Sequence, residues 1–299
     1  MIENNQKYEI AVLGGDRRQA NMINEFLARG FGVRAYGLGG HYTKCNGAEI
    51  FSSIDKAMDG ADAVILPLPV TRDNLYLSAD GEKVSLSDIV KLTAKNRAFL
   101  LGGMLPQEMI RQCEALGVEA CDYYKSEALQ KKNALPSAEG ALMIAMEHTD
   151  ITVKGMKALV TGFGRIGALL ADMLDKLGAD VTVGARRDEV LCELSLLGYR
   201  AVRIGGDGTE LGEAVKNSDV IFNTVPSVIF NEKVLSEVRN KPLYVEIASS
   251  PGGIDLGAAR KIGIEIVFAP SLPGKYSPVN AGRYIFETIS EMLSERRKI

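Results

Sequence analysis

The sequence predicts an α/β protein with two doubly wound domains, each built on a parallel sheet, and a long helix that links them. The chain of 299 residues has room for about two domains of ordinary size. Two successive series of short apolar segments alternate with helical patterns along it, and a glycine-rich turn opens the second series. Apolar strands separated by helices are typical of parallel sheets that helices cover on both faces.

The first series contains five expected strands. Pro67 and Pro69 end the third of them, because proline cannot donate to the hydrogen-bond ladder of a sheet. The strands are expected at 8–13, 33–36, 63–66, 98–101 and 118–121, and two helices at 18–29 and 107–116.

The second series contains six expected strands, the number found in a complete Rossmann dinucleotide-binding fold. These strands are expected at 158–161, 180–183, 201–204, 220–222, 243–247 and 265–268, with helices that include 166–177 and 188–197. We therefore expect two Rossmann-like domains, the second with the more complete pattern.

Between the two series, Pro136 followed by Ser137 and Glu139 is typical of a helix start, and the apolar residues that follow indicate burial between domains. The expected parts are an N-terminal substrate or catalytic domain at 1–135, a linking helix at 136–150 and a dinucleotide-binding domain at 151–279. The amphipathic pattern at 282–295 predicts a last helix, and we expect the segment 280–299 to pack back on the first domain.

The composition excludes several classes of function. Hydrophobic residues make up 46% and charged residues 24%, as in soluble globular proteins. The net charge is −3 without a long basic run, so nucleic acid is not expected as a main partner. No signal peptide pattern and no apolar run of roughly 18 residues is seen, so a cytoplasmic protein without a membrane partner is expected. The four scattered cysteines indicate neither a metal site nor a disulfide framework.

The strongest motif is the run Gly162-Phe163-Gly164-Arg165-Ile166-Gly167, which lies between an expected strand and an expected helix. Gly162 permits a tight turn, Gly164 lets the backbone approach a pyrophosphate, and Gly167 lets the helix pack against the strand. The amides at the helix N-terminus then point at the anion. A purely structural glycine turn is the alternative interpretation.

The residues after the second strand of this series select the cofactor. NAD-binding folds place an Asp or Glu there, which accepts a hydrogen bond from the ribose 2′-hydroxyl. Here Ala185 is followed by Arg186 and Arg187, and the first carboxylate is Asp188. Arginines bind a 2′-phosphate, so NADP is the expected cofactor. The alternative is that both arginines are solvated residues at a helix start.

Three later loops are expected at the carboxyl edge of the same sheet. Thr224, Val225 and Pro226 follow the fourth strand and are expected to line the cofactor, unless Pro226 only ends the strand. The loops 248–253 and 269–275 reach the same edge, which favours a functional cleft over plain turn chemistry.

In the first series, residues 14–19 lack the full glycine fingerprint, so a second dinucleotide is not expected. Arg17 and Arg18 lie beside a helix N-terminus, and they are candidates for binding a substrate carboxylate or are surface arginines. His41 and His148, the only histidines, belong to no recognisable acid–base pair. A histidine-centred hydride transfer of the hydroxy-acid type is therefore not favoured.

Seven sequence blocks together resemble the family of A subunits of the dipicolinate synthases of spore-forming bacteria. The resemblance covers nearly the whole chain and keeps the blocks in order, and the first two and the last two are the most specific. The blocks are 10–19, 139–150, 162–167, 183–186, 223–227, 248–253 and 269–274. The resemblance implies NADP-dependent oxidation of a dihydrodipicolinate to dipicolinate during sporulation, with a smaller, flavin-binding second subunit of the synthase as partner.

The implied reaction converts a dihydropyridine into an aromatic ring, which needs orientation beside the nicotinamide more than a strong acid–base pair. For a dicarboxylate substrate the candidate ligands are Arg17, Arg18 and Lys275, and the candidates for relaying the proton are Ser227, Ser249 and Ser250.

Two other functions are compatible with the sequence. One is an NADP enzyme similar to shikimate or methylene-tetrahydrofolate dehydrogenase, and the other is a non-catalytic NADP-binding subunit of a two-component synthase. The oligomeric state, a homo-oligomer included, is not fixed by the sequence.

Overall fold

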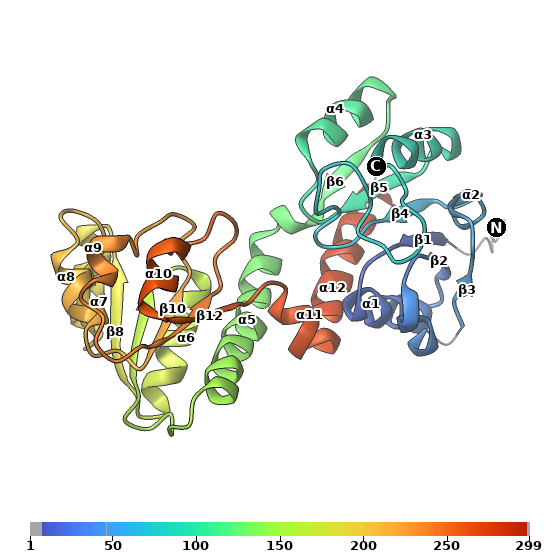
Figure 1. The fold of residues 1–299 in the computed structure, drawn as a ribbon. Helices are drawn as coiled ribbons and strands as arrows, with labels where there is room; N and C mark the ends of the chain where they lie inside the picture. The colour runs from blue at the N-terminus through green and yellow to red at the C-terminus, as the bar shows by residue number, and fades with distance from the viewer. Residues whose placement is uncertain (1–7, 46, 298–299) are drawn as a thin grey trace. The chain divides into compact units, whose positions relative to one another are not determined.

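The protein is seen in a computed structural model that describes residues 8–45 and 47–297 (Figure 1). The chain forms two compact units. Unit 1 combines the residues up to Asn133 with those from Ser277 onward, and unit 2 contains Ala134–Tyr276.

Unit 1 contains a six-stranded parallel sheet in the order β3-β2-β1-β4-β5-β6. The order reverses between β1 and β4, as in doubly wound folds. The strands are β1 (Glu9–Leu13), β2 (Gly32–Tyr36), β3 (Glu49–Ile50), β4 (Ala63–Ile65), β5 (Phe99–Gly102) and β6 (Ala120–Asp122). The helices are α1 (Arg17–Ala28), α2 (Ile54–Met58), α3 (Leu86–Asn96), α4 (Gln107–Ala115) and α12 (Pro278–Arg297).

Successive side chains of β1 point to opposite faces of this sheet, and each face has its own core. Ile10 and Val12 belong to the core that α1 and α12 cover, whereas Ala11 and Leu13 belong to the core under α2, α3 and α4. Helix α12 comes close to α1 at Gly282, where an added Cβ would lie 2.5 Å from the Arg18 carbonyl oxygen. The chain therefore returns to unit 1 at its end, with α12 as part of the core.

Unit 2 repeats the architecture with a parallel sheet in the order β12-β11-β10-β7-β8-β9. Its strands are β7 (Lys157–Thr161), β8 (Asp180–Ala185), β9 (Arg200–Arg203), β10 (Val220–Asn223), β11 (Leu243–Glu246) and β12 (Glu265–Phe268). Its helices are α6 (Arg165–Lys176), α7 (Asp188–Leu196), α8 (Thr209–Val215), α9 (Glu232–Leu235), α10 (Leu256–Ile262) and α11 (Leu272–Tyr276). Helix α5 (Glu127–His148) begins in unit 1 and continues into unit 2.

The sheet of unit 2 is also buried on both faces. Val160 and Phe222 pack into the core that α5 and α6 cover, and Leu159 and Ile221 into the core under α8, α9 and α10. All four side chains are fully buried. This burial fixes the register of β7 and β10, because a shift by one residue would exchange their two faces.

The predicted fold class, two doubly wound α/β units with parallel sheets, is confirmed. One strand was missed by the sequence prediction: β3 has two residues, Glu49 and Ile50, and both are exposed, so no apolar segment marks it. Among residues 8–45 and 47–297, no helix is both long and apolar enough to cross a bilayer.

The predicted helix start at Pro136 is wrong, because α5 begins at Glu127 and contains Pro136 in its interior. A proline inside a helix removes one hydrogen bond and costs about 3 kcal/mol relative to alanine. Ala138, Ala141 and Ala145 are fully buried in the part of the helix that follows it, and this tertiary packing holds the helix continuous. The compact units divide between Asn133 and Ala134, within this helix.

Candidate functional site

The turn from β7 into α6 is built from glycines, each of which has a distinct steric reason. Gly162 has a φ of +93°, which side chains other than glycine rarely adopt, and a Cβ there would overlap the Thr224 hydroxyl. A Cβ at Gly167 would overlap the Gly162 carbonyl, so glycine is needed for α6 to pack against the strand end. At Gly164 an added Cβ would meet nothing within 4 Å, which leaves space above the backbone.

The N-terminus of α6 carries no side-chain cap. Its N-cap residue is Gly164, which has no side chain that could accept a hydrogen bond from the amides of the first turn. Helix α1 of unit 1 differs, because Asp16 caps it and accepts a hydrogen bond from the Arg18 amide. The uncapped amides and the helix dipole favour an anion at α6.

A pocket of about 280 Å³ opens beside this turn, at the carboxyl edge of the unit 2 sheet. Its lining combines the glycine turn with the ends of β8 and β10. The lining residues are Gly162, Phe163, Gly164, Ala185, Arg186, Arg187, Val190, Ile204, Thr224, Val225 and Pro226. Nine of the twelve residues predicted to bind the cofactor therefore surround one cavity.

The other three predicted residues lie in α6, outside the lining. Arg165 is exposed, Ile166 packs against the core, and Gly167 is buried against the turn. The sequence prediction missed Val190 and Ile204, which give the pocket an apolar wall. Their signal was weak, since one is an ordinary apolar helix residue and the other directly follows β9.

A network of buried polar side chains adjoins the pocket-lining residues, at the ends of β7, β10 and β11. Thr161 and Asn223 are fully buried, and Glu246 is 3% exposed. The Thr161 hydroxyl donates to Asn223 Oδ1 at 2.7 Å, and Asn223 Nδ2 donates to Glu246 Oε1 at 2.7 Å. The three side chains form one chain of hydrogen bonds across neighbouring strands.

The Glu246 carboxylate accepts hydrogen bonds on both oxygens. Besides Asn223, the Ala248 amide donates to Oε1 at 3.2 Å, and the Gly253 amide donates to Oε2 at 2.7 Å. The Tyr244 hydroxyl also donates to Oε2, at 3.2 Å. Burial, together with the Glu246 charge, raises the pKa of Tyr244 well above its usual range, so this hydroxyl stays a donor at neutral pH.

This network fixes the loops that follow β10 and β11. The Val225 amide donates to Asn223 Oδ1 at 3.1 Å, and Asn223 Nδ2 donates to the Val225 carbonyl at 3.0 Å. A Cβ at Gly253 would overlap the Asn223 amide, so the second loop comes into direct contact with the first. Sequence reasoning missed Thr161 and Glu246; a polar residue at the end of an apolar strand is the signal that marks them.

The three serines predicted to relay a proton are exposed and do not belong to the pocket lining. Ser227 directly follows the lining residue Pro226. Ser249 and Ser250 lie in the loop after β11, where the Ser249 carbonyl accepts from the Gly252 amide.

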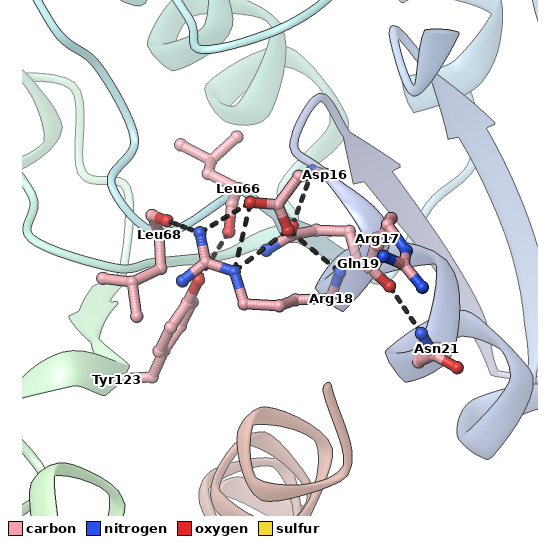
Figure 2. A network of polar contacts seen from close by, with 8 residues as sticks. All are labelled: Asp16, Arg17, Arg18, Gln19, Asn21, Leu66, Leu68 and Tyr123. Atoms are coloured by element: carbon pink, nitrogen blue, oxygen red, sulfur yellow. Dashed lines mark hydrogen bonds and ion pairs between the residues drawn. The ribbon is translucent and has the colours of Figure 1, made fainter. Parts of the chain in front are cut away.

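In unit 1, Arg18 is buried and held by groups of the same chain (Figure 2). Its Nη2 contacts Asp16 Oδ2 at 2.8 Å and also donates to the Leu68 carbonyl. Burial by itself raises the pKa of Asp16, but the hydrogen bonds and charge of Arg18 outweigh it, so this pKa lies below its usual range. A substrate carboxylate would have to compete with Asp16 for Arg18.

The other two candidate ligands for a carboxylate are exposed. Arg17 points away from the Asp16–Arg18 pair (Figure 2). Lys275 lies on α11 in unit 2, and its Nζ is 4.7 Å from the centre of the Tyr276 ring. Arg17 and Arg18 thus belong to unit 1 and Lys275 to unit 2. In the described parts of the chain, no three His, Cys, Asp or Glu side chains are grouped to hold a metal ion.

Comparisons with known proteins agree on one family. The sequence model of the N-terminal domain of the dipicolinate synthase A subunit matches residues 9–124. The A subunit of dipicolinate synthase from Bacillus subtilis (strain 168) is 32% identical over 297 residues, which are 96% of this chain and 96% of that protein.

A solved structure of the same family gives the same result. The crystal structure of the dipicolinate synthase A chain from Bacillus subtilis superimposes with a TM-score of 0.82 at 30% identity, covering 98% of both chains. A transhydrogenase from Sinorhizobium meliloti superimposes with a TM-score of 0.67 at 14% identity, covering 96% of this chain and 94% of that one. At that identity the second likeness concerns the fold alone.

The buried network generates a stability prediction. Asn223→Ala removes the partner of the Thr161 hydroxyl and one donor to Glu246, so the free energy of unfolding should fall by roughly 2–5 kcal/mol. Asn217→Ala, at an exposed position, is the control and should change it by less than about 0.5 kcal/mol. Denaturant unfolding of both variants measures the difference; equal stabilities would contradict a structural role for the network.

Proposed function

Because the chain belongs to the family of dipicolinate synthase A subunits, we propose that it is an NADP-dependent oxidoreductase that oxidises a dihydrodipicolinate to dipicolinate. The membership confirms the resemblance seen in the sequence, and it supports this reaction more than the shikimate or methylene-tetrahydrofolate dehydrogenase alternative. The observation that carries the proposal is the pocket in unit 2, where the glycine turn and two arginines meet at the carboxyl edge of the sheet.

The residues present fit a dinucleotide with a 2′-phosphate. The uncapped amides of α6 would hold the pyrophosphate, and Gly164 leaves space for it above the backbone. Arg186 and Arg187 are exposed at the pocket rim and would hold the 2′-phosphate. Thr224, Val225 and Pro226 would line the part nearer the nicotinamide, which accepts a hydride when the cofactor is bound.

The substrate in this proposal is a cyclic dicarboxylate. The oxidation transfers one hydride to NADP and releases one proton, breaking two bonds to hydrogen and leaving an aromatic pyridine ring. Arg17 in unit 1 and Lys275 in unit 2 are exposed, and each by itself is proposed as a ligand of a substrate carboxylate. Arg18 is proposed to orient Asp16 and the start of α1. Aromatisation supplies the driving force, so positioning of the ring is the main task of these residues.

The proton is proposed to leave through hydroxyl groups and water. Ser227, Ser249 and Ser250 are exposed on the loops after β10 and β11, so each is able to pass a proton to solvent. A serine hydroxyl is too weak a base to hold the proton, and this role is therefore a relay.

The proposal includes a second polypeptide. The relative is named as one subunit of its synthase, which implies a partner in that complex. By the family resemblance, we propose that this partner is a flavin-binding second subunit, and we propose a role in spore formation and a cytoplasmic location. A homo-oligomer of the present chain is compatible with the same site.

A second candidate function is a non-catalytic NADP carrier within the synthase. One observation favours it: the described lining of the pocket contains glycine, apolar residues, threonine and arginine, but no His, Asp, Glu, Cys, Tyr or Lys. A pocket without an acid or a base is suited to holding a cofactor whose chemistry is completed by a partner.

The cofactor assignment predicts a selective effect of Arg186→Ala. Loss of one charge-assisted contact should weaken NADP binding by roughly 1.5–3 kcal/mol and leave NAD binding almost unchanged. Calorimetric titration of both cofactors measures this, with Arg260→Ala on the exposed face of α10 as the control. Equal weakening of NADP and NAD would contradict a 2′-phosphate contact.

The reaction predicts formation of NADPH when the chain meets freshly generated dihydrodipicolinate and NADP. Absorbance at the NADPH band, followed with the chain alone and with its partner subunit, measures it. Turnover by the chain alone supports the oxidoreductase, and turnover only in the mixture supports the carrier. No turnover in either preparation would refute the dipicolinate reaction.

A further inference from the structure

Arg203 contacts the segment that is proposed to bind the 2′-phosphate, although no sequence motif marks it. It is the last residue of β9 and lies opposite Ala185, the last residue of β8. Its Nη2 forms an ion pair with Asp188, and its Nη1 donates to the Arg186 carbonyl at 3.3 Å. The next residue, Ile204, donates its amide to the Ala185 carbonyl at 2.8 Å and lines the pocket.

The negative charge of Asp188 disfavours binding of a 2′-phosphate. It is the first carboxylate after β8 and directly follows Arg187, a residue of the pocket lining. A carboxylate in this region repels a 2′-phosphate and accepts a hydrogen bond from the 2′-hydroxyl of NAD. The Asp188 side chain is 79% exposed, so packing does not restrain it. The ion pair with Arg203 is the contact that restrains the Asp188 side chain.

Two other features support the contact between Arg203 and Asp188: the backbone of Arg203 is anchored, and its side chain is charged. Its backbone amide donates to Glu210 Oε2 at 2.9 Å, which ties the end of β9 to the first turn of α8. The hydrogen bond and charge of Asp188 raise the pKa of Arg203, so its guanidinium is charged at neutral pH.

We propose that Arg203 is a positioning residue that sets the preference of this pocket for NADP over NAD. It neutralises Asp188 and turns it away from the ribose, and it fixes the backbone of Arg186 so that the arginine side chains face the 2′ position. This inference rests on the proposed cofactor, and it adds a residue that acts through Asp188 and Arg186 without touching the phosphate.

A structural role alone would give a different result. The ion pair is exposed, with 40% of the Arg203 side chain and 79% of the Asp188 side chain accessible, and exposed pairs contribute little to stability. Removing Arg203 should therefore leave the melting temperature nearly unchanged while cofactor selectivity falls. Selectivity and stability are thus separate readouts.

The test measures the Kd of NADP and of NAD by titration, without turnover, for wild type, Arg203→Ala, and Arg203→Ala combined with Asp188→Asn. We expect Arg203→Ala to lower the NADP-to-NAD selectivity at least about ten-fold, because it leaves an unneutralised carboxylate beside the 2′-phosphate. The added Asp188→Asn should restore most of the NADP affinity. Arg200→Ala, at the exposed start of the same strand, is the matched control and should leave selectivity unchanged.

Three outcomes would overturn the inference. Unchanged selectivity in Arg203→Ala would remove any role for Arg203. A loss of NADP affinity that Asp188→Asn does not restore even in part would contradict action through Asp188. A loss of both cofactors with a lowered melting temperature would show a structural role. If the wild type itself shows no preference for NADP, the cofactor proposal fails and the role of Arg203 in setting that preference fails with it.

Discussion

The carboxylate of Glu246 lies almost completely buried at the end of β11, and a buried charge is stable only where donors surround it. The chain supplies these donors from three places: the Asn223 side chain at the end of β10, Tyr244 on the same strand, and the backbone amides of Ala248 and Gly253. Two of these donors belong to the loop after β11. The conformation of that loop therefore depends on one carboxylate.

The same network reaches the pocket. Asn223 binds both the amide and the carbonyl of Val225, a residue of the pocket lining, and Thr161 precedes the glycine turn. Thr224 also donates its hydroxyl to the Thr161 carbonyl at 2.8 Å. The pocket thus has a preorganised wall whose backbone is set by buried hydrogen bonds, which is what a site that must orient a cofactor requires.

The two units share a fold but differ at the corresponding helix N-terminus. In unit 1, Asp16 caps α1 and pairs with Arg18, so a carboxylate of the chain already meets the amides and the cation. In unit 2, Gly164 gives α6 no cap, and the pocket lies beside it. The two helices thus differ by one side chain at the N-cap. The amides of α1 have an acceptor within the chain, whereas the amides of α6 are suited to binding an external anion.

The sequence allowed prediction of much of the fold because buried parallel strands are marked by continuous apolar segments, as at 158–161 and 220–222. It did not allow prediction of β3, because the two residues of this strand are exposed. It also did not allow prediction of the true start of α5, because packing around Ala138 and Ala141 overrides the local effect of Pro136. The glycine turn was predictable since each glycine has a steric reason.

Side-chain partners were harder to predict. Arg18 looked like a ligand-binding cation, but its pairing with Asp16 and the Leu68 carbonyl depends on burial between elements distant in sequence. Glu246 and Arg203 are single charged residues at strand ends, and their roles emerge only when neighbouring strands are placed in register.

Amide hydrogen exchange in a Glu246→Leu variant tests most directly whether one buried carboxylate holds both loops. Leucine is of similar size but has no acceptor, so we predict that the Gly253 amide, which loses its acceptor, exchanges at least about ten-fold faster than in wild type. The Val225 amide, which donates to Asn223 Oδ1, should accelerate with it, whereas the Ile221 amide in the middle of β10 should stay protected. Acceleration at Gly253 without any change at Val225, or no change at either amide, would contradict the account.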